Sequence, residues 1–369
     1  MNVRRIMVVT GSRADWGPLR PVVRAMSSDV RTESLIVVTG AHCDPRLGAT
    51  ASEIEAEGVE IARRVPLGDG PMSDQMARDT QGVGEAFREL TPDAALVLGD
   101  RYEALAAATA IVAEGGFLAH LHGGEITTGA IDNQFRYAIT ALAHLHLVAT
   151  KGARTRLVAM GERPERVIVT GAPGLDGVVA PLAAGHGSSE PFVLVTLHSE
   201  TLGGDPEEQA RTLIEALDRV GRPCVITGAN ADPGGETINT VLRDACEQRE
   251  NWTFEMNLGA TRYREAMTRA ACMVGNSSSG IIEAASFGLR VVNIGSRQDG
   301  RERSGNVADV AWDAEAIATE TRRAIDAGRW SGDNVYGDGR ASERIVEALA
   351  TVDLTDRTKP FSPPSTRLG

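Results

Sequence analysis

Residues 6–17 read IMVVTGSRADWG and introduce the pattern that the rest of the chain repeats. The apolar run Ile6–Thr10 predicts a buried strand, and the small residues of Gly11–Gly17 predict a tight turn. A helix is expected over Pro18–Met26, opening just after the glycine. Strand, turn and helix in this order are the building unit of a parallel sheet covered by helices.

The same alternation continues through the first half of the chain. The expected strands are Ile6–Thr10, Ser34–Thr39, Ala94–Leu98, Phe117–Leu121, Leu145–Val148 and Arg166–Thr170. The expected helices are Pro18–Met26, Met76–Leu90, Glu103–Ala113 and Asn133–Ala143. Strands that alternate with helices in this way indicate a mostly parallel sheet with helices on both faces.

Periodicity is lost at Gly171–Ser189, where Gly, Pro, Ala and Ser accumulate, and we expect the linker there. A second series follows. Its strands are Phe192–Thr196, Pro223–Thr227, Trp252–Glu255, Cys272–Val274 and Arg290–Asn293, and its helices are Pro206–Val220, Glu236–Glu250, Arg262–Ala270 and Gly280–Gly288. The prediction is an α/β protein of two Rossmann-like domains, residues 1–175 and 176–369, with a tail from about 352 that is given no structure.

Composition restricts the classes of partner and compartment. The 369 residues are 42% hydrophobic and 24% charged, enough for two sizeable cores, and the net charge of -12 argues against binding to nucleic acid or an anionic membrane. The four cysteines are scattered without CxxC spacing, which disfavours zinc and disulfides. With no export signal and no apolar run of the ~18 residues that span a bilayer, a cytoplasmic protein is expected.

Polar residues follow several expected strands of the first half. Arg13 could bind a phosphate at the following helix N-terminus, or it could be a solvated turn residue. Asp100 and Arg101 follow the third strand and could be a plain ion pair. His122 and Glu125 follow the fourth strand; His122 could equally be a core histidine. Because carboxyl ends of parallel strands meet at one edge, their clustering favours a site.

Asp132 adds a third carboxylate near the start of an expected helix, although it could be only a helix N-cap. Three acidic groups at one edge, Asp100, Glu125 and Asp132, could supply general acid and base catalysis if their surroundings separate their pKa values. With two sheets expected, the natural place for the site is a cleft between the two domains.

The second half offers groups suited to an anion. His198 follows its first strand, and Asn230 and Asp232 follow the second. Ser277 and Ser278 belong to a run of three serines that precedes a helix, which suits a diphosphate but could also be a simple N-cap. Glu283, further along the same helix, could accept the two ribose hydroxyls of a nucleotide. Arg297, with Arg301 and Arg303, could reach the site or only face solvent.

These residues resemble a known family in the same order and over nearly the whole chain up to the tail. The stretches that carry the resemblance are GSRAD (11–15), GDR (99–101), HGGE (122–125) with GAID (129–132), GNSS (275–278), and SRQ with GRE (296–298 and 300–302). They are similar to the hydrolysing UDP-N-acetylglucosamine 2-epimerases, including those of sialic acid and legionaminic acid biosynthesis. The resemblance implies a GT-B-like fold of two Rossmann-like domains facing each other across a cleft.

The resemblance also implies a reaction and a set of roles. UDP would be eliminated across C1 and C2 to a 2-acetamidoglycal, and water would then add to give the free, C2-inverted sugar without a metal or other cofactor. Asp100, Glu125 and Asp132 would be the catalytic carboxylates, with His198 near the diphosphate. The expected substrate contacts are Arg13, Arg101, His122, Asn230, Asp232, Ser277, Ser278, Glu283 and Arg297. A homodimer or homotetramer is suggested by the family only.

The substrate and the type of reaction stay open. UDP-N-acetylglucosamine and a 2,4-diacetamido-6-deoxy relative both fit the resemblance. A non-hydrolysing epimerase would return UDP to the inverted sugar, and a GT-B glycosyltransferase would need an acceptor. A catalytically silent UDP-sugar binder has no need of acidic groups beside a diphosphate. The chain departs from many relatives at Asn133, Tyr137, Ala141 and Leu142, so substrate detail could differ.

Overall fold

The computed structural model describes residues 3–47, 49–126, 131–177, 191–200, 204–230 and 233–359. The chain forms two compact units, each built on its own sheet. Unit 1 contains residues 1–126, 130–177 and 336–369, and unit 2 contains residues 127–129 and 178–335. Both sheets are parallel wherever neighbouring strands pair, so the α/β class expected from the alternating pattern is confirmed.

The sheet of unit 1 has the strand order β3-β2-β1-β4-β5-β6-β7. Its strands are β1 (Arg4–Thr10), β2 (Thr32–Thr39), β3 (Ile61–Val65), β4 (Ala94–Leu98), β5 (Leu118–Leu121), β6 (Leu145–Val148) and β7 (Val167–Val169). Its helices are α1 (Arg13–Ser28), α2 (Ala51–Ala56), α3 (Met72–Leu90), α4 (Tyr102–Ala113), α5 (Asp132–Leu142), α6 (Lys151–Ala159) and α12 (Ala341–Thr351).

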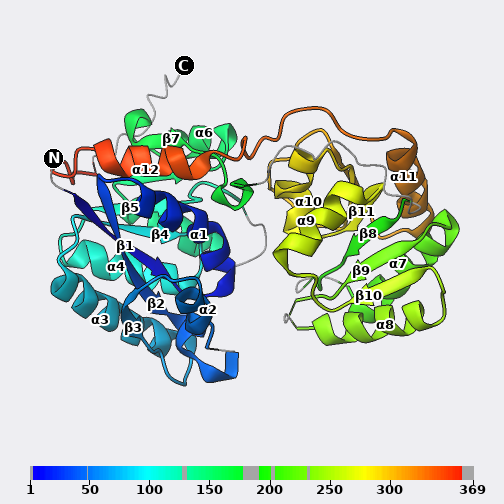
Figure 1. Cartoon of the computed structure of the whole chain (residues 1–369), viewed down its shortest axis with the longest axis horizontal. Coiled ribbons are helices and arrows are strands. Elements are labelled where there is room, and N and C mark those ends of the chain that lie inside the picture. The colour runs from blue at the N-terminus through cyan, green and yellow to red at the C-terminus, as the bar shows by residue number, and fades with distance from the viewer. Residues whose placement is uncertain are drawn as a thin grey trace, which may run out of the picture. The chain divides into compact units, whose positions relative to one another are not determined.

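The two faces of this sheet are buried by different helices (Figure 1). Ile6 and Val8 of β1 pack with residues of α1 and α12, whereas the alternate residues Met7 and Val9 pack with residues of α3 and α4. Alternation along a strand sends neighbouring side chains to opposite faces. An apolar run such as Ile6–Val9 is therefore required of a strand covered on both sides.

Unit 2 repeats the arrangement with the strand order β10-β9-β8-β11-β12-β13. Its strands are β8 (Val193–Thr196), β9 (Cys224–Thr227), β10 (Trp252–Glu255), β11 (Cys272–Gly275), β12 (Val291–Ile294) and β13 (Val307–Val310). Its helices are α7 (Pro206–Val220), α8 (Gly235–Glu247), α9 (Gly259–Arg269), α10 (Ser278–Ile282) and α11 (Ala314–Asp326). One face packs on α7, α8 and α11, and α9 covers part of the other.

The C-terminal segment belongs to unit 1, which corrects the expectation that everything after residue 176 forms the second domain. The apolar side of α12, with Ile345 and Leu349, is buried in the same core as α1. Both carboxylate oxygens of Asp176 accept backbone N–H groups at the start of α12, from Ala341 at 2.9 Å and Ser342 at 2.5 Å. An amphipathic helix is stable only where its apolar face is buried. For α12, the surface that buries this face is the first sheet with α1.

Other expectations were wrong at element boundaries. The first helix begins at Arg13 rather than Pro18, and contains Pro18 and Pro21. Strand β3 was not expected because its sequence IARRV has two consecutive arginines and too few apolar residues to indicate a strand, as an edge position allows. The helix expected over Gly280–Gly288 is broken after Ile282, where α10 ends and a short 3₁₀ turn follows.

In its described part, residues 352–359, the tail forms no helix or strand, as expected, and it packs as an arm. The ammonium of Lys359 contacts both carboxylate oxygens of Glu162 at 2.6 Å. Arg166 donates to the backbone oxygen of Asp353 at 3.1 Å. Residues 352–359 are thus held against unit 1 by ionic and backbone contacts. Across the part of the chain that the structure describes, none of the helices is both long and apolar enough to span a bilayer.

Candidate active site

Asp100 lies directly after β4 and is paired with Arg136 of α5. The sequence also allowed an ion pair between Asp100 and Arg101. In the structure Arg101 is paired with Glu103 instead. The Arg136 side chain is 4% exposed, whereas that of Asp100 is 23% exposed. The ion pair therefore fixes the carboxylate from its buried side and leaves part of it accessible.

His122 and Glu125 form a hydrogen-bonded pair in the loop after β5. His122 Nδ1 lies 2.6 Å from Glu125 Oε1, and the two side chains are 15% and 11% exposed. Arg136 donates to the backbone oxygen of Glu125 at 2.9 Å, with the same guanidinium that pairs with Asp100. The loops after β4 and β5 are thus joined through one buried arginine.

Asp132 is the first residue of α5, and Ile131 occupies the N-cap position. The alternative that Asp132 is simply the N-cap is therefore wrong. Burial raises the pKa of the Asp132 carboxyl, the charge of Asp100 raises it further, and Arg101 and Arg136 oppose the rise. The three predicted carboxylates lie on adjoining elements of unit 1, and two of them are coupled electrostatically. Gly129 and Ala130 of the same motif lie outside the described residues.

Arg101 is held over a buried acidic group at the start of α4. Its guanidinium donates two hydrogen bonds to Glu103, of 3.1 and 2.9 Å, and the Glu103 side chain is 3% exposed. Asp15 lies nearby and accepts from Gly11 N at 3.2 Å and Ser12 Oγ at 3.0 Å. Burial raises the pKa of Asp15 to about 6, against the lowering effect of Arg101. Arg101 therefore links the loop after β1 to the loop after β4.

Arg13 is paired with a carboxylate of the neighbouring helix α2. Its guanidinium donates to both carboxylate oxygens of Glu53 on α2, and its side chain is 65% exposed. A phosphate would have to compete with the Glu53 carboxylate for the N–H donors of the Arg13 guanidinium. The role of Arg13 in phosphate binding stays a prediction.

His198 of unit 2 is fixed on both its backbone and its ring. The buried Asn276 accepts from His198 N at 2.7 Å and donates to His198 O at 2.8 Å. The backbone N–H of Asn230 donates to His198 Nδ1 at 3.1 Å. Because Nδ1 accepts, the neutral ring carries its proton on Nε2 and can donate from there. A donor of this kind suits a phosphate oxygen.

Ser277 and Ser278 follow β11, with Ser277 at the N-cap of α10. The Ser277 hydroxyl lies 2.9 Å from that of Ser279, which lies 2.8 Å from the hydroxyl of Tyr263. Tyr263 in turn lies 3.1 Å from the hydroxyl of Thr196, at the end of β8. The serine loop is therefore one end of a connected row of hydroxyls. Asp232, the expected neighbour of Asn230, lies outside the described residues.

Glu283 and Arg297 lie on the elements after β11 and β12. Glu283 is the C-cap residue of α10, and burial raises the pKa of its carboxyl while Arg264 opposes the rise. Arg297 Nη1 donates to Asn276 O at 3.4 Å, and Gln298 Nε2 donates to the same oxygen at 2.9 Å. Glu200 accepts from the backbone N–H of Arg297 at 3.2 Å. Asn276 thus ties His198, the serine loop and Arg297 together.

Sequence reasoning missed the residues that connect these groups, namely Arg136, Asn276 and Glu200. Arg136 follows Asp132 by one helical turn, a spacing that places both on one face of α5. That spacing could have suggested it. Nothing in the sequence pairs Asn276 with His198, because 78 residues separate them.

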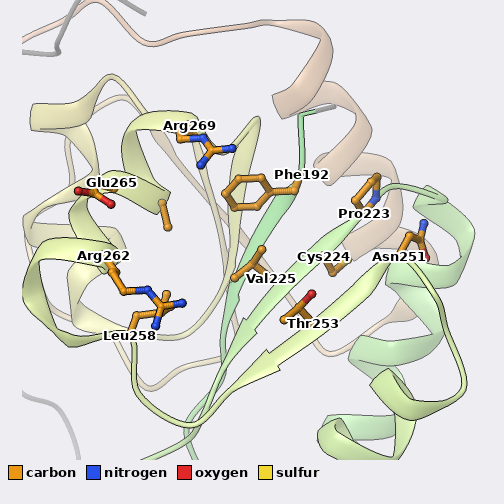
Figure 2. A pocket seen from close by; sticks show the side chains of 11 residues that line it. Phe192, Pro223, Cys224, Val225, Asn251, Thr253, Leu258, Arg262, Glu265 and Arg269 are labelled. Carbon is orange, nitrogen blue, oxygen red and sulfur yellow. The ribbon is translucent and has the colours of Figure 1, made fainter. Parts of the chain in front are cut away.

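Two hollows lie at different ends of the sheets. One, of about 390 Å³, is lined in unit 1 by residues of the loops after β2, β3 and β4, with Arg101, Tyr102 and Glu103 among them. The other, of about 330 Å³, lies at the amino ends of β8, β9 and β10, next to Phe192, Pro223 and Asn251. Figure 2 shows Arg262, Glu265 and Arg269 of α9 lining the second hollow. Only the first lies at the carboxyl ends of strands, where parallel sheets bind ligands.

Two parallel-sheet units with polar groups at the carboxyl ends of their strands define a GT-B-like α/β protein. Residues 24–350 match the UDP-N-acetylglucosamine 2-epimerase family, and the chain belongs to that family.

Its relatives are similar over most of their length. The hydrolysing UDP-N,N'-diacetylbacillosamine 2-epimerase of Legionella pneumophila is 36% identical over 367 residues, covering 95% of this chain and 97% of the relative. The hydrolysing GDP/UDP-N,N'-diacetylbacillosamine 2-epimerase of Campylobacter jejuni is 35% identical and covers 84% and 85%. The crystal structure of UDP-GlcNAc 2-epimerase from Neisseria meningitidis bound to UDP-GlcNAc has a TM-score of 0.78 at 17% identity, covering 94% and 99%.

Proposed function

We propose that this chain hydrolyses a UDP-activated 2-acetamido sugar to UDP and the free sugar inverted at C2. The observation that carries the proposal is the joining of Asp100 and Glu125 by the buried Arg136, with Asp132 at the start of the same helix. Proton transfer at a carbon next to the leaving group needs acidic and basic groups held at fixed positions. A protein that only binds a nucleotide sugar gains nothing from such an arrangement.

The reaction we propose has two steps. In the first, the C2 proton is removed, a C1=C2 double bond forms, and the C1–O bond breaks with its electron pair leaving on UDP. In the second, water adds its oxygen to C1 and a proton reaches C2 on the opposite face. Asp100, Glu125 and Asp132 form the acid and base machinery, in which a carboxylate either transfers a proton itself or orients the group that transfers it. The raised pKa of Asp132 favours it as the group that holds a proton.

Unit 2 provides the nucleotide contacts in this proposal. His198 donates from Nε2 to the diphosphate, because its Nδ1 already accepts from Asn230. Ser277, Ser278 and Arg297 add donors to the developing negative charge of the leaving group. Glu283 accepts the ribose hydroxyls. Arg13, Arg101, His122, Asn230 and Asp232 complete the expected substrate contacts.

The sugar that we propose is a 2,4-diacetamido-6-deoxy hexose. The relatives at 36% and 35% identity are both named for diacetylbacillosamine. The 390 Å³ hollow beside Arg101 also supports the choice, since Cys43, Leu67 and the Tyr102 ring give it apolar walls. Walls of this kind suit an acetamido methyl and a C6 methyl better than they suit hydroxyls.

The test is a product assay in heavy water with UDP-2,4-diacetamido-2,4,6-trideoxyglucose and UDP-N-acetylglucosamine side by side. The expected products are UDP and a free sugar carrying deuterium at C2, formed faster from the diacetamido substrate. Accumulation of a C2-inverted UDP-sugar would mean a non-hydrolysing epimerase. Release of UDP without C2 exchange would exclude epimerisation altogether.

A further inference from the structure

The loop after β5 holds an imidazole in an unusual and well-fixed position. His122 has a φ of 64°, in the left-handed region that few residues other than glycine adopt. Its backbone N–H donates to Leu147 O at 3.1 Å, which ties it to the end of β6. Strain at a residue that the surrounding structure over-determines is a frequent property of functional sites.

The residues after His122 hold the loop closely against its neighbours. Gly124 also has a positive φ, and a Cβ added there would lie 2.8 Å from Ala153 O and 2.9 Å from Leu157 Cγ. Arg156 of α6 donates to the backbone oxygen of Gly124. The loop therefore reaches Glu125 by a path that only a glycine at this position allows. This path brings the Glu125 carboxylate back to the ring of His122.

The contact between the two side chains assigns different tasks to the two ring nitrogens. Nδ1 lies 2.6 Å from Glu125 Oε1, so this nitrogen carries the proton that the carboxylate accepts. Nε2 of the neutral ring is then the basic nitrogen. A carboxylate behind an imidazole fixes the tautomer and stabilises the imidazolium that forms when Nε2 takes up a proton.

We propose that His122 is the base that removes the C2 proton, and that Glu125 is its positioning residue rather than a base itself. This rests on the proposed function. The proton moves from C2 to Nε2, the C2–H electron pair forms the C1=C2 bond, and the C1–O pair leaves on UDP. The Glu125 carboxylate then faces an imidazolium, and Arg136 keeps Glu125 in place through its backbone oxygen.

Several charged or titratable side chains lie on the elements packed around this loop. They are Asp100 and Arg101 after β4, His120 of β5, Asp132 and Arg136 of α5, and Arg156 of α6. His120 is fully buried, its Nε2 lies 2.8 Å from Gly99 O, and burial lowers its pKa to about 3. The His120 ring therefore stays neutral at any pH near neutrality, so it adds no charge beside His122.

The first test is chemical rescue of His122→Gly. Glycine adopts the left-handed backbone without strain and leaves a space the size of the lost ring. UDP release should fall about 100- to 10,000-fold, and added imidazole should restore part of it in proportion to its unprotonated fraction. The rescued reaction should show a larger isotope effect with substrate deuterated at C2, because proton removal has become slow. Imidazole should leave wild-type turnover unchanged.

The second test uses Glu125→Gln, which keeps the size of the side chain. The acidic limb of its pH profile for kcat/KM should move to lower pH, because the imidazolium loses the carboxylate that stabilised it. If Glu125 were the base, this limb would disappear and imidazole would not rescue His122→Gly. Either of these results would overturn the proposal. A wild-type protein that releases no sugar would instead refute the proposed function, and Glu125→Gln answers the question if His122→Gly does not fold.

Discussion

Arg136 and Asp100 form an ion pair in which the guanidinium is almost completely buried and the carboxylate is partly exposed. The same guanidinium donates to the backbone of Glu125, so one side chain of α5 sets the positions of two loops. Burying a cation is costly unless it is paired and hydrogen-bonded. The pair thus links the stability of unit 1 to the geometry of its candidate site.

Replacing Arg136 by Met should lower both stability and turnover. The variant leaves Asp100 and the Glu125 carbonyl without their partner, and we expect a loss of roughly 2–4 kcal/mol in the free energy of unfolding. Urea unfolding measures the loss. Arg340→Met is the matched control, because its pair with Glu343 is exposed on both sides. Equal stability of the two variants would contradict the argument.

Asp100→Asn should separate binding from chemistry. The amide keeps the size of the side chain but cannot act as an acid or a base, so sugar release should fall about 100- to 10,000-fold. UDP affinity should change little, because the proposed nucleotide contacts lie in unit 2. Calorimetric titration with UDP and the product assay measure the two effects. Unchanged turnover would remove Asp100 from the proposed chemistry.

Glu283→Gln should weaken nucleotide binding about 10- to 100-fold, which corresponds to losing a hydrogen bond to a charged acceptor. If the carboxylate accepts the ribose hydroxyls, 2′,3′-dideoxy-UDP should bind the variant and the wild type equally well. Titration of both proteins with both nucleotides gives the comparison. A uniform loss for the two ligands would mean that Glu283 acts on the fold and not on the ribose.

Asp79 of α3 should make stability fall as pH rises. Its Oδ1 lies 2.7 Å from Thr39 Oγ1, which also lies 3.1 Å from Val65 O. The single hydroxyl proton of Thr39 serves only one of them, which favours a protonated Asp79 that donates. Burial raises the pKa of Asp79 to about 7. The folded chain therefore keeps this proton up to about pH 7, whereas the unfolded chain releases it near pH 4.

The free energy of unfolding should therefore decrease with rising pH. The stability that Asp79 contributes is full below about pH 4 and is lost as pH rises through about 7, by at most roughly 4 kcal/mol. Asp79→Asn imitates the protonated form, so its stability relative to wild type should increase between pH 5 and pH 8. Thermal or urea unfolding at these two values measures the difference. Asp74→Asn, at an exposed position on the same helix, is the matched control.

Ala41→Leu should change substrate preference if the hollow beside Arg101 receives the second acetamido group. Ala41 lines this hollow, and a larger side chain would occupy part of it. The value of kcat/KM should fall about 10-fold or more for the diacetamido substrate and much less for UDP-N-acetylglucosamine. An equal loss of kcat/KM for both substrates would show that the hollow does not determine which substrate is preferred.

The sequence by itself determined the two parallel α/β units and the strand ends at which polar residues gather. Apolar runs such as Ile6–Val9 are long enough to require burial on both faces, and the glycine-rich turns after them mark where each strand ends. These signals are local, so they could be read without coordinates. The resemblance in the motifs around Asp100 and Ser277 likewise depended only on residue order.

Tertiary structure alone decided which partners these residues have. Asp100 is paired with Arg136 rather than its neighbour Arg101, Arg13 is engaged by Glu53, and α12 returns to the first sheet. Each outcome depends on which side chains meet across elements 30 or more residues apart, and hydrophobic periodicity carries no information about such distant pairings. The hydrogen bond between His122 and Glu125 was also decided by the tertiary structure, although only three residues separate them. Their spacing alone gives no sign that a left-handed backbone at His122 turns the ring toward the carboxylate.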